Sequence, residues 1–136
     1  MIVSVFVRRL KEGRTFDDFV TEWEADKGFG VPTRVLNSVS LEDPRDILTV
    51  GFVDVTVDEL QDALAGVASQ EAVRHDRIET VIEKTTLKCM YDVKTEHDFT
   101  TDPRVIELGS AESLFRGLLQ ERALSEERAE IPATGD

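Results

Sequence analysis

Cysteine is nearly absent from this chain of 136 residues, which has Cys89 alone. A single cysteine excludes a disulfide within the chain and any metal site built from several thiolates, and it agrees with a reducing compartment. Histidine is also scarce, because His75 and His97 are the only two, and their spacing is not that of metal ligands. The sequence therefore predicts no metal site and no cofactor.

Long apolar runs and an excess of positive charge are missing as well. No run approaches the roughly 20 apolar residues that a membrane span needs, and Arg8 and Arg9 follow the apolar start, whereas a signal peptide has its basic residues first. The 28 acidic and 16 basic residues give a net charge of −12, which on average repels nucleic acid. We expect a soluble cytoplasmic protein that binds neither membranes nor nucleic acid.

Alternating apolar residues predict four strands, and two capping motifs predict the helices between them. The strands are expected at residues 2–8, 33–40, 47–55 and 81–93. Thr15 with Asp18 begins the first helix, which Lys27–Gly28 is expected to end. Thr56 with Glu59 begins the second, and Gly66 and Ser69 should weaken its end before a further helical stretch at 70–79. The apolar stripes of the two helices comprise Phe16, Phe19, Val20 and Trp23, then Leu60, Ala63, Leu64 and Val67.

The resulting β-α-β-β-α-β order over residues 1–93 predicts an α+β, ferredoxin-like domain, an antiparallel sheet with both helices on one face. The turn at 41–46 should join the second and third strands as an antiparallel hairpin. Residues 94–109 are expected to form a polar connector, with a short extended piece at 105–108. An amphipathic C-terminal helix at 110–124 and a disordered tail at 125–136 would follow.

The first and third strands are apolar on both alternating faces, so both faces of the sheet should be covered. In the first strand the sets are Ile2 and Phe6 against Val3, Val5 and Val7. Since two helices cover one face only, a second copy of the chain is the expected cover for the other, which predicts a homodimer. The C-terminal helix is the alternative, either folded over its own sheet or lying at the rim and reaching across to the partner.

Three segments carry a family resemblance: residues 15–23 in the first helix, 50–54 at the end of the third strand and 56–60 at the start of the second helix. Together with the element order, they resemble the dimeric α/β-barrel superfamily, which includes antibiotic-biosynthesis-type monooxygenases and stress-responsive barrel proteins. The resemblance implies a homodimer with a pocket between sheet and helices in each subunit. Ser4 stands where haem-degrading members have asparagine, and Trp23 lies on the first helix instead of the second, which argues against haem degradation.

His75 is the first candidate for chemistry, because an imidazole can move protons near neutral pH. Its alternative is a solvated residue on a charged helix, and His97 is expected at the surface. Trp23 either lines the pocket, where its ring suits an aromatic ligand, or belongs to the core. Phe19, Asn37 and Tyr91 are further pocket candidates, Asn37 because a buried amide needs hydrogen-bond partners.

Two functions remain open from the sequence. The chain has no nucleophile elbow, phosphate loop or dinucleotide fingerprint, so nothing in it requires catalysis. A non-catalytic ligand-binding or structural dimer is therefore favoured. The alternative is a small cofactor-independent oxygenase or isomerase-like enzyme that acts on an apolar or aromatic small molecule, with His75 as acid or base.

Overall fold

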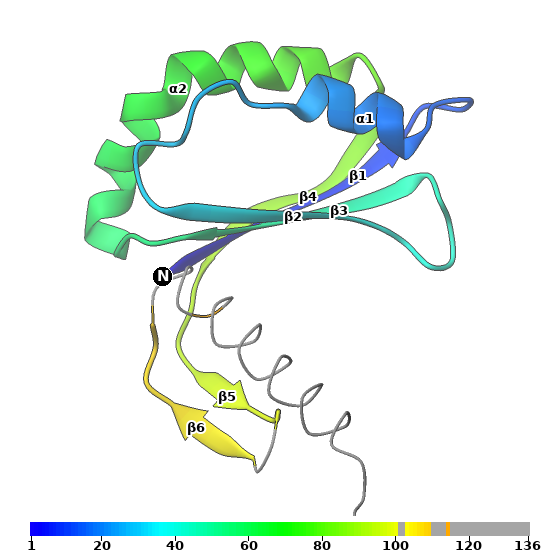
Figure 1. Cartoon of the computed structure of the whole chain (residues 1–136). Helices are drawn as coiled ribbons and strands as arrows, with labels where there is room; N and C mark the ends of the chain where they lie inside the picture. The colour runs from blue at the N-terminus through cyan, green and yellow to red at the C-terminus, as the bar shows by residue number, and fades with distance from the viewer. Residues whose placement is uncertain (101–102, 110–113, 115–136) are drawn as a thin grey trace, which may run out of the picture.

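A computed structural model of the chain describes residues 1–100, 103–109 and 114. Its elements follow in the order β1 (Ile2–Leu10), α1 (Phe16–Trp23), β2 (Thr33–Val39), β3 (Asp46–Val53), α2 (Val57–Glu79), β4 (Ile82–Asp92), β5 (Glu96–Asp98) and β6 (Arg104–Ile106). The first four strands form one antiparallel sheet in the order β2-β3-β1-β4, and both helices lie on the same face of it (Figure 1). The protein is thus α+β, and its arrangement is consistent with a ferredoxin-like fold.

The predicted hairpin is confirmed, since β2 and β3 pair antiparallel with Asn37 opposite Thr49. Both predicted capping motifs are present as complete capping boxes. Thr15 and Thr56 each accept a hydrogen bond from the backbone N–H three residues on, and Asp18 and Glu59 accept one from the cap residue in return. These exchanges satisfy N–H groups that the first turn of a helix leaves without a partner.

Helix α1 ends at Trp23, four residues before the predicted stop at Lys27–Gly28. Two arginines of α2 explain the early end. Arg74 Nη1 donates to the Trp23 carbonyl at 3.0 Å, and Arg77 Nη2 donates to the Glu24 carbonyl at 2.8 Å. Carbonyl groups at a helix end need such partners, and here the second helix supplies them.

Helix α2 is one continuous element of 23 residues, so the predicted break near Gly66 and Ser69 is wrong. Gly66 is exposed, and glycine inside a helix costs only about 1 kcal/mol relative to alanine. The capping box at one end and the buried Arg74 and Ile78 near the other hold the helix across that position. No helix in the described ranges is both long and apolar enough to cross a membrane.

The close-packed core lies at one end of the space between helices and sheet. It contains the six buried side chains of Leu10, Phe19, Ile47, Ile78, Val81 and Ile82, with Phe16, Val20, Trp23 and Val39 packed around them. Phe19 has no exposed surface. The end of β1, helix α1 and the last turns of α2 meet here, so this end supplies the dense packing that a stable domain needs.

Of the two alternating sets of residues in β1, the one that faces the helices is Ile2, Ser4, Phe6, Arg8 and Leu10. The opposite side of the sheet, called the open face below, presents three register pairs of the central strands: Val3 with Phe52, Val5 with Val50, and Val7 with Leu48. Leu36, Leu87 and Tyr91 extend it onto the edge strands. Neither α1 nor α2 lies on this face (Figure 1).

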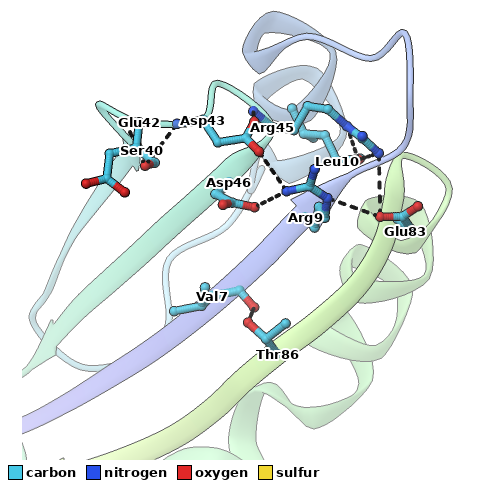
Figure 2. A network of polar contacts seen from close by, with 10 residues as sticks. All are labelled: Val7, Arg9, Leu10, Ser40, Glu42, Asp43, Arg45, Asp46, Glu83 and Thr86. Atoms are coloured by element: carbon cyan, nitrogen blue, oxygen red, sulfur yellow. Dashed lines mark hydrogen bonds and ion pairs between the residues drawn. The ribbon is translucent and has the colours of Figure 1, made fainter.

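A polar network joins three strands at one end of the open face (Figure 2). Arg9 Nη1 lies 2.9 Å from Asp43 and 2.8 Å from Asp46, and its Nε lies 3.3 Å from Glu83. Arg45 donates twice to the Leu10 carbonyl and lies 3.5 Å from the same Glu83. The network links β1, the β2–β3 turn and β4 where the sheet meets the core end.

Strand β4 is irregular, and the chain after it forms a second small sheet. Its pairing with β1 shifts between Val7 and Arg8 and again between Arg9 and Leu10. The expected connector at 94–109 contains the β5–β6 hairpin, which lies beyond the main sheet on the side away from the helices (Figure 1). The predicted helix at 110–124, apart from Leu114, and the tail at 125–136 lie outside the described residues.

Candidate functional site

A pocket of about 360 Å³ lies between α2 and the sheet, at the opposite end from the close-packed core. Its floor comes from the helix-facing side of the strands, its roof from α2, and one wall from Trp23 and the loop that carries Phe29 and Val31. The lining is mainly apolar. The full set is Ser4, Phe6, Arg8, Trp23, Phe29, Val31, Thr33, Val35, Thr49, Gly51, Val53, Leu60, Ala63, Leu64, Val67, Ala68, Glu71, Arg74, His75, Lys88 and Met90.

The pocket exists because the first half of α2 does not pack onto the sheet. The apolar stripe of Leu60, Ala63, Leu64 and Val67 lines the pocket, and Leu64 remains 42% exposed. The floor below it is built from small residues. Gly51 pairs with Ser4 in the sheet, and a Cβ added at Gly51 would lie 2.6 Å from Ser4 Oγ. The volume of about 360 Å³ is that of a site for a small organic molecule.

Arg74 is the best-connected polar residue of the pocket. Its Nε and Nη2 donate to the two carboxylate oxygens of Glu71 at 3.2 and 2.6 Å, and its Nη1 reaches the Trp23 carbonyl. The guanidinium carbon also lies 4.8 Å from the centre of the Trp23 ring and 5.6 Å from that of Phe29. Its charge is neutralised by Glu71 and each of its three nitrogens donates a hydrogen bond, so Arg74 fixes the wall between the two helices.

Arg8 differs from Arg74 although both are buried cations of the same pocket. It is 3% exposed, and its Nη1 is buried without a hydrogen-bond partner in the described part of the chain. Its guanidinium carbon lies 4.1 Å from the centre of the Phe6 ring. Burial and the nearby Arg74 lower its pKa to about 10, partly offset by Glu79, so it stays charged at neutral pH. An unpaired buried charge costs on the order of several kcal/mol, which makes Arg8 an unusual residue to keep.

His75 stands beside these two arginines. Its Nε2 lies 3.3 Å from Glu71 Oε2, and its ring is tilted against Phe6 with 5.6 Å between the ring centres. Burial, followed by the charges of Arg74 and Arg8, lowers the pKa of His75 below its ordinary value of 6.5, while Glu71 opposes the shift. The imidazole is therefore neutral at pH 7. A neutral imidazole has one ring nitrogen without a proton, which can accept one.

The predicted site residues divide into two groups. His75 and Trp23 line the pocket. Phe19 is in the close-packed core, Asn37 accepts a hydrogen bond from Thr49 Oγ1 at 2.7 Å outside the pocket lining, and Tyr91 is 53% exposed on the open face beside Cys89. Of the five candidates, only His75, chosen for its imidazole, and Trp23, chosen from the stripe of the first helix, lie in the pocket lining.

Arg8, Glu71 and Arg74 are site residues that the sequence analysis did not single out. Arg8 carried a usable signal, because it falls on the same alternating face as Ile2, Phe6 and Leu10. A charge on the buried face of a strand needs a partner or a function. For the pair on α2, the signal was the i, i+3 spacing of an acid and an arginine beside a histidine.

Within the described ranges, no three histidine, cysteine, aspartate or glutamate side chains group closely enough to hold a metal ion. Comparison with protein-family models, curated proteins and solved structures found no match to this chain.

Proposed function

We propose that this protein binds a small apolar or aromatic molecule in the pocket between α2 and the sheet, without transforming it. The observation that carries this proposal is an apolar pocket of about 360 Å³ in a domain whose other end is close-packed. Leaving the stripe of α2 apart from the sheet forgoes burial worth about 0.8 kcal/mol for each methylene group. A ligand that fills the pocket recovers that burial.

A neutral fluorescent probe tests the proposal. N-phenyl-1-naphthylamine brightens in apolar surroundings, so titration into the full chain should give a saturable rise in emission. Ala63→Phe, which fills the pocket from α2, should abolish this rise. Ala72→Phe places the same side chain on the same helix at an exposed position outside the lining and should leave it unchanged. Emission unaffected by Ala63→Phe would remove the pocket as the binding site.

The protein is further proposed to be a homodimer joined through its open faces. Six side chains of β1 and β3 stand in three register pairs on this face, and burying them would contribute on the order of 10 kcal/mol before association costs. Because they form one central patch, a second copy related by a two-fold axis would bury the same six again. This extends to a dimeric α/β barrel of the kind that the sequence resembles.

Sedimentation of the full chain at micromolar concentration tests the dimer. A dimer is expected, and Val5→Asp together with Val50→Asp should convert it to a monomer, since the two residues face each other in the centre of the patch. A wild-type monomer would overturn the proposal. If a chain ending at residue 109 then became dimeric, the C-terminal segment would be the cover in place of a second copy.

One observation favours a catalytic function as the second candidate. His75 presents a neutral imidazole to an apolar pocket, which is the state that a general base requires. An oxygenase or isomerase of this kind would begin by removing a proton next to a carbonyl group. Exchange of the α-protons of 2-tetralone in D₂O, followed by NMR, separates the two functions. Acceleration by the wild type and not by His75→Gln would establish catalysis, and no acceleration by either supports binding alone.

A further inference from the structure

We propose that the ligand of the pocket is a monocarboxylate whose carboxyl group pairs with Arg8, while its apolar body lies under α2. This inference rests on the proposed binding function and names the chemical class of the ligand. Its basis is the contrast between two buried arginines of one pocket. Arg74 is neutralised by Glu71, whereas Arg8 Nη1 is buried without a hydrogen-bond partner in the described ranges.

The charges of the pocket favour an anion although the chain as a whole is acidic. The lining includes Arg8, Arg74 and Lys88 but only one acidic residue, Glu71, in a protein of net charge −12. Since Glu71 is committed to Arg74, Arg8 is the buried charge left to balance. Glu79 is exposed, and its charge raises the pKa of Arg8 by less than burial and Arg74 lower it. One uncompensated cation matches one carboxylate, and a phosphate dianion would bring a surplus negative charge close to Glu71.

The residues around Arg8 indicate where the carboxylate and the apolar body of such a ligand would lie. The Phe6 ring contacts both the Arg8 guanidinium and the His75 ring, with 4.1 Å from its centre to the guanidinium carbon and 5.6 Å between the ring centres. This is the polar end. Gly51, Val53, Ala63 and Val67 line the pocket beyond it and offer no charged group. A carboxylate at Arg8 with an aromatic or aliphatic body extending over Gly51 satisfies both ends, as in small-molecule sites with few polar groups in an apolar lining.

A matched pair of probes tests the charge. 2-Naphthoate and 2-naphthamide have the same shape and differ in the charge of one group. The wild-type chain should bind 2-naphthoate roughly 10- to 100-fold more tightly by calorimetry, the range expected for a hydrogen bond to a charged group. Arg8→Met should remove this preference, because it should weaken the binding of 2-naphthoate far more than that of the uncharged 2-naphthamide. Lys88→Met, at an exposed cation of the same lining, should retain most of it.

Thermal unfolding of the Arg8→Met variant without ligand provides an independent readout. Replacing an unpaired buried charge with an apolar side chain of similar length should raise Tm, whereas loss of a structural contact would lower it. A raised Tm together with lost carboxylate preference is the signature of a residue kept for binding.

The outcomes separate this inference from the proposed function. If N-phenyl-1-naphthylamine binds but 2-naphthoate and 2-naphthamide bind equally well, the carboxylate assignment is overturned and the apolar pocket stands. If 2-naphthyl phosphate binds more tightly than 2-naphthoate, the ligand class is wrong although Arg8 remains the anion site. If the neutral probe does not bind, the proposed function itself fails.

Discussion

The two ends of the layer between helices and sheet are built from one set of elements and packed in opposite ways. At the core end, the side chains of Phe19, Ile47 and Ile78 pack together and are at most 1% exposed. At the pocket end, a cavity separates α2 from the part of the sheet that contains Gly51. Arg74 lies at the boundary and holds α1 and α2 together. The difference shows that stability and binding are assigned to separate parts of a small domain.

The largest effect is expected from removing a core side chain. Phe19→Ala should lower the free energy of unfolding by about 3–5 kcal/mol, because a large cavity opens in a close-packed region. Leu64→Ala on the pocket end should cost less than about 1 kcal/mol, since Leu64 is already 42% exposed. Urea unfolding of both variants measures the contrast. Equal losses would mean that the two ends are packed alike.

The second-largest loss of stability is expected from removing the contacts of Arg74 between the two ends. Arg74→Met removes the bonds to Glu71 and to the Trp23 carbonyl and leaves those groups without a donor. We expect a loss of about 2–3 kcal/mol. Asp17→Asn, which alters an exposed charge on α1, is the matched control and should leave the urea midpoint nearly unchanged. A silent Arg74→Met would show that α1 is held by its apolar face alone.

A larger side chain should change the free energy of unfolding in opposite directions at the two ends. Val81→Phe inserts a ring into the core and should cost about 1–3 kcal/mol through overpacking. Ala63→Phe inserts one into the pocket, where space is present, and should leave stability unchanged or raise it by up to about 1 kcal/mol. Thermal unfolding of the two variants gives the comparison. A destabilising Ala63→Phe would indicate that the pocket is narrower than its volume implies.

The smallest effect is a pH dependence confined to the pocket end. The pKa of His75 is lower in the folded protein than its ordinary value of 6.5. Burial is the main cause, the charges of Arg74, Arg8 and Lys88 add to it, and the charge of Glu71 acts in the opposite direction. The unfolded chain therefore takes up the proton first as the pH falls. Stability conferred by the neutral ring is complete above pH 6.5 and is lost as the pH falls through the folded pKa. The urea midpoint of the wild type should therefore fall between pH 7 and pH 5. This fall should be smaller in His75→Gln and unchanged in His97→Gln.

Much of this architecture could be predicted from the sequence because it follows from local patterns. Period-two alternation, turn residues and the two capping boxes set the elements from β1 to β4. The end of α1 could not be found that way, since it depends on Arg74 and Arg77, which are distant in sequence. The continuity of α2 through Gly66 likewise depends on what packs against its far end.

The site was harder to predict than the fold. A strand position is identified as buried when it is apolar, so Arg8 escaped notice on a face that also carries Ile2 and Leu10. Tyr91 and Asn37 were candidates because their residue types suit a pocket. The register of β4 with β1 places Tyr91 on the open face, whereas Asn37 is on the helix-facing side but is bonded to Thr49 outside the pocket lining. Trp23 was a candidate because helical spacing places it on the apolar stripe of its helix, and His75 because of the chemistry of its imidazole.

The irregular pairing of β4 bears on how copies of the protein can meet. A long edge strand invites another strand to add to its free backbone groups. Strand β4 is 11 residues long, yet its pairing with β1 shifts twice. Exposed Lys84 lies between the two shifts, and exposed Lys88 lies one residue beyond Leu87, the last regularly paired residue before the first shift. Such an edge is a poor template for extending the sheet from molecule to molecule. Uncontrolled growth into fibres is thereby discouraged without any change to the apolar open face.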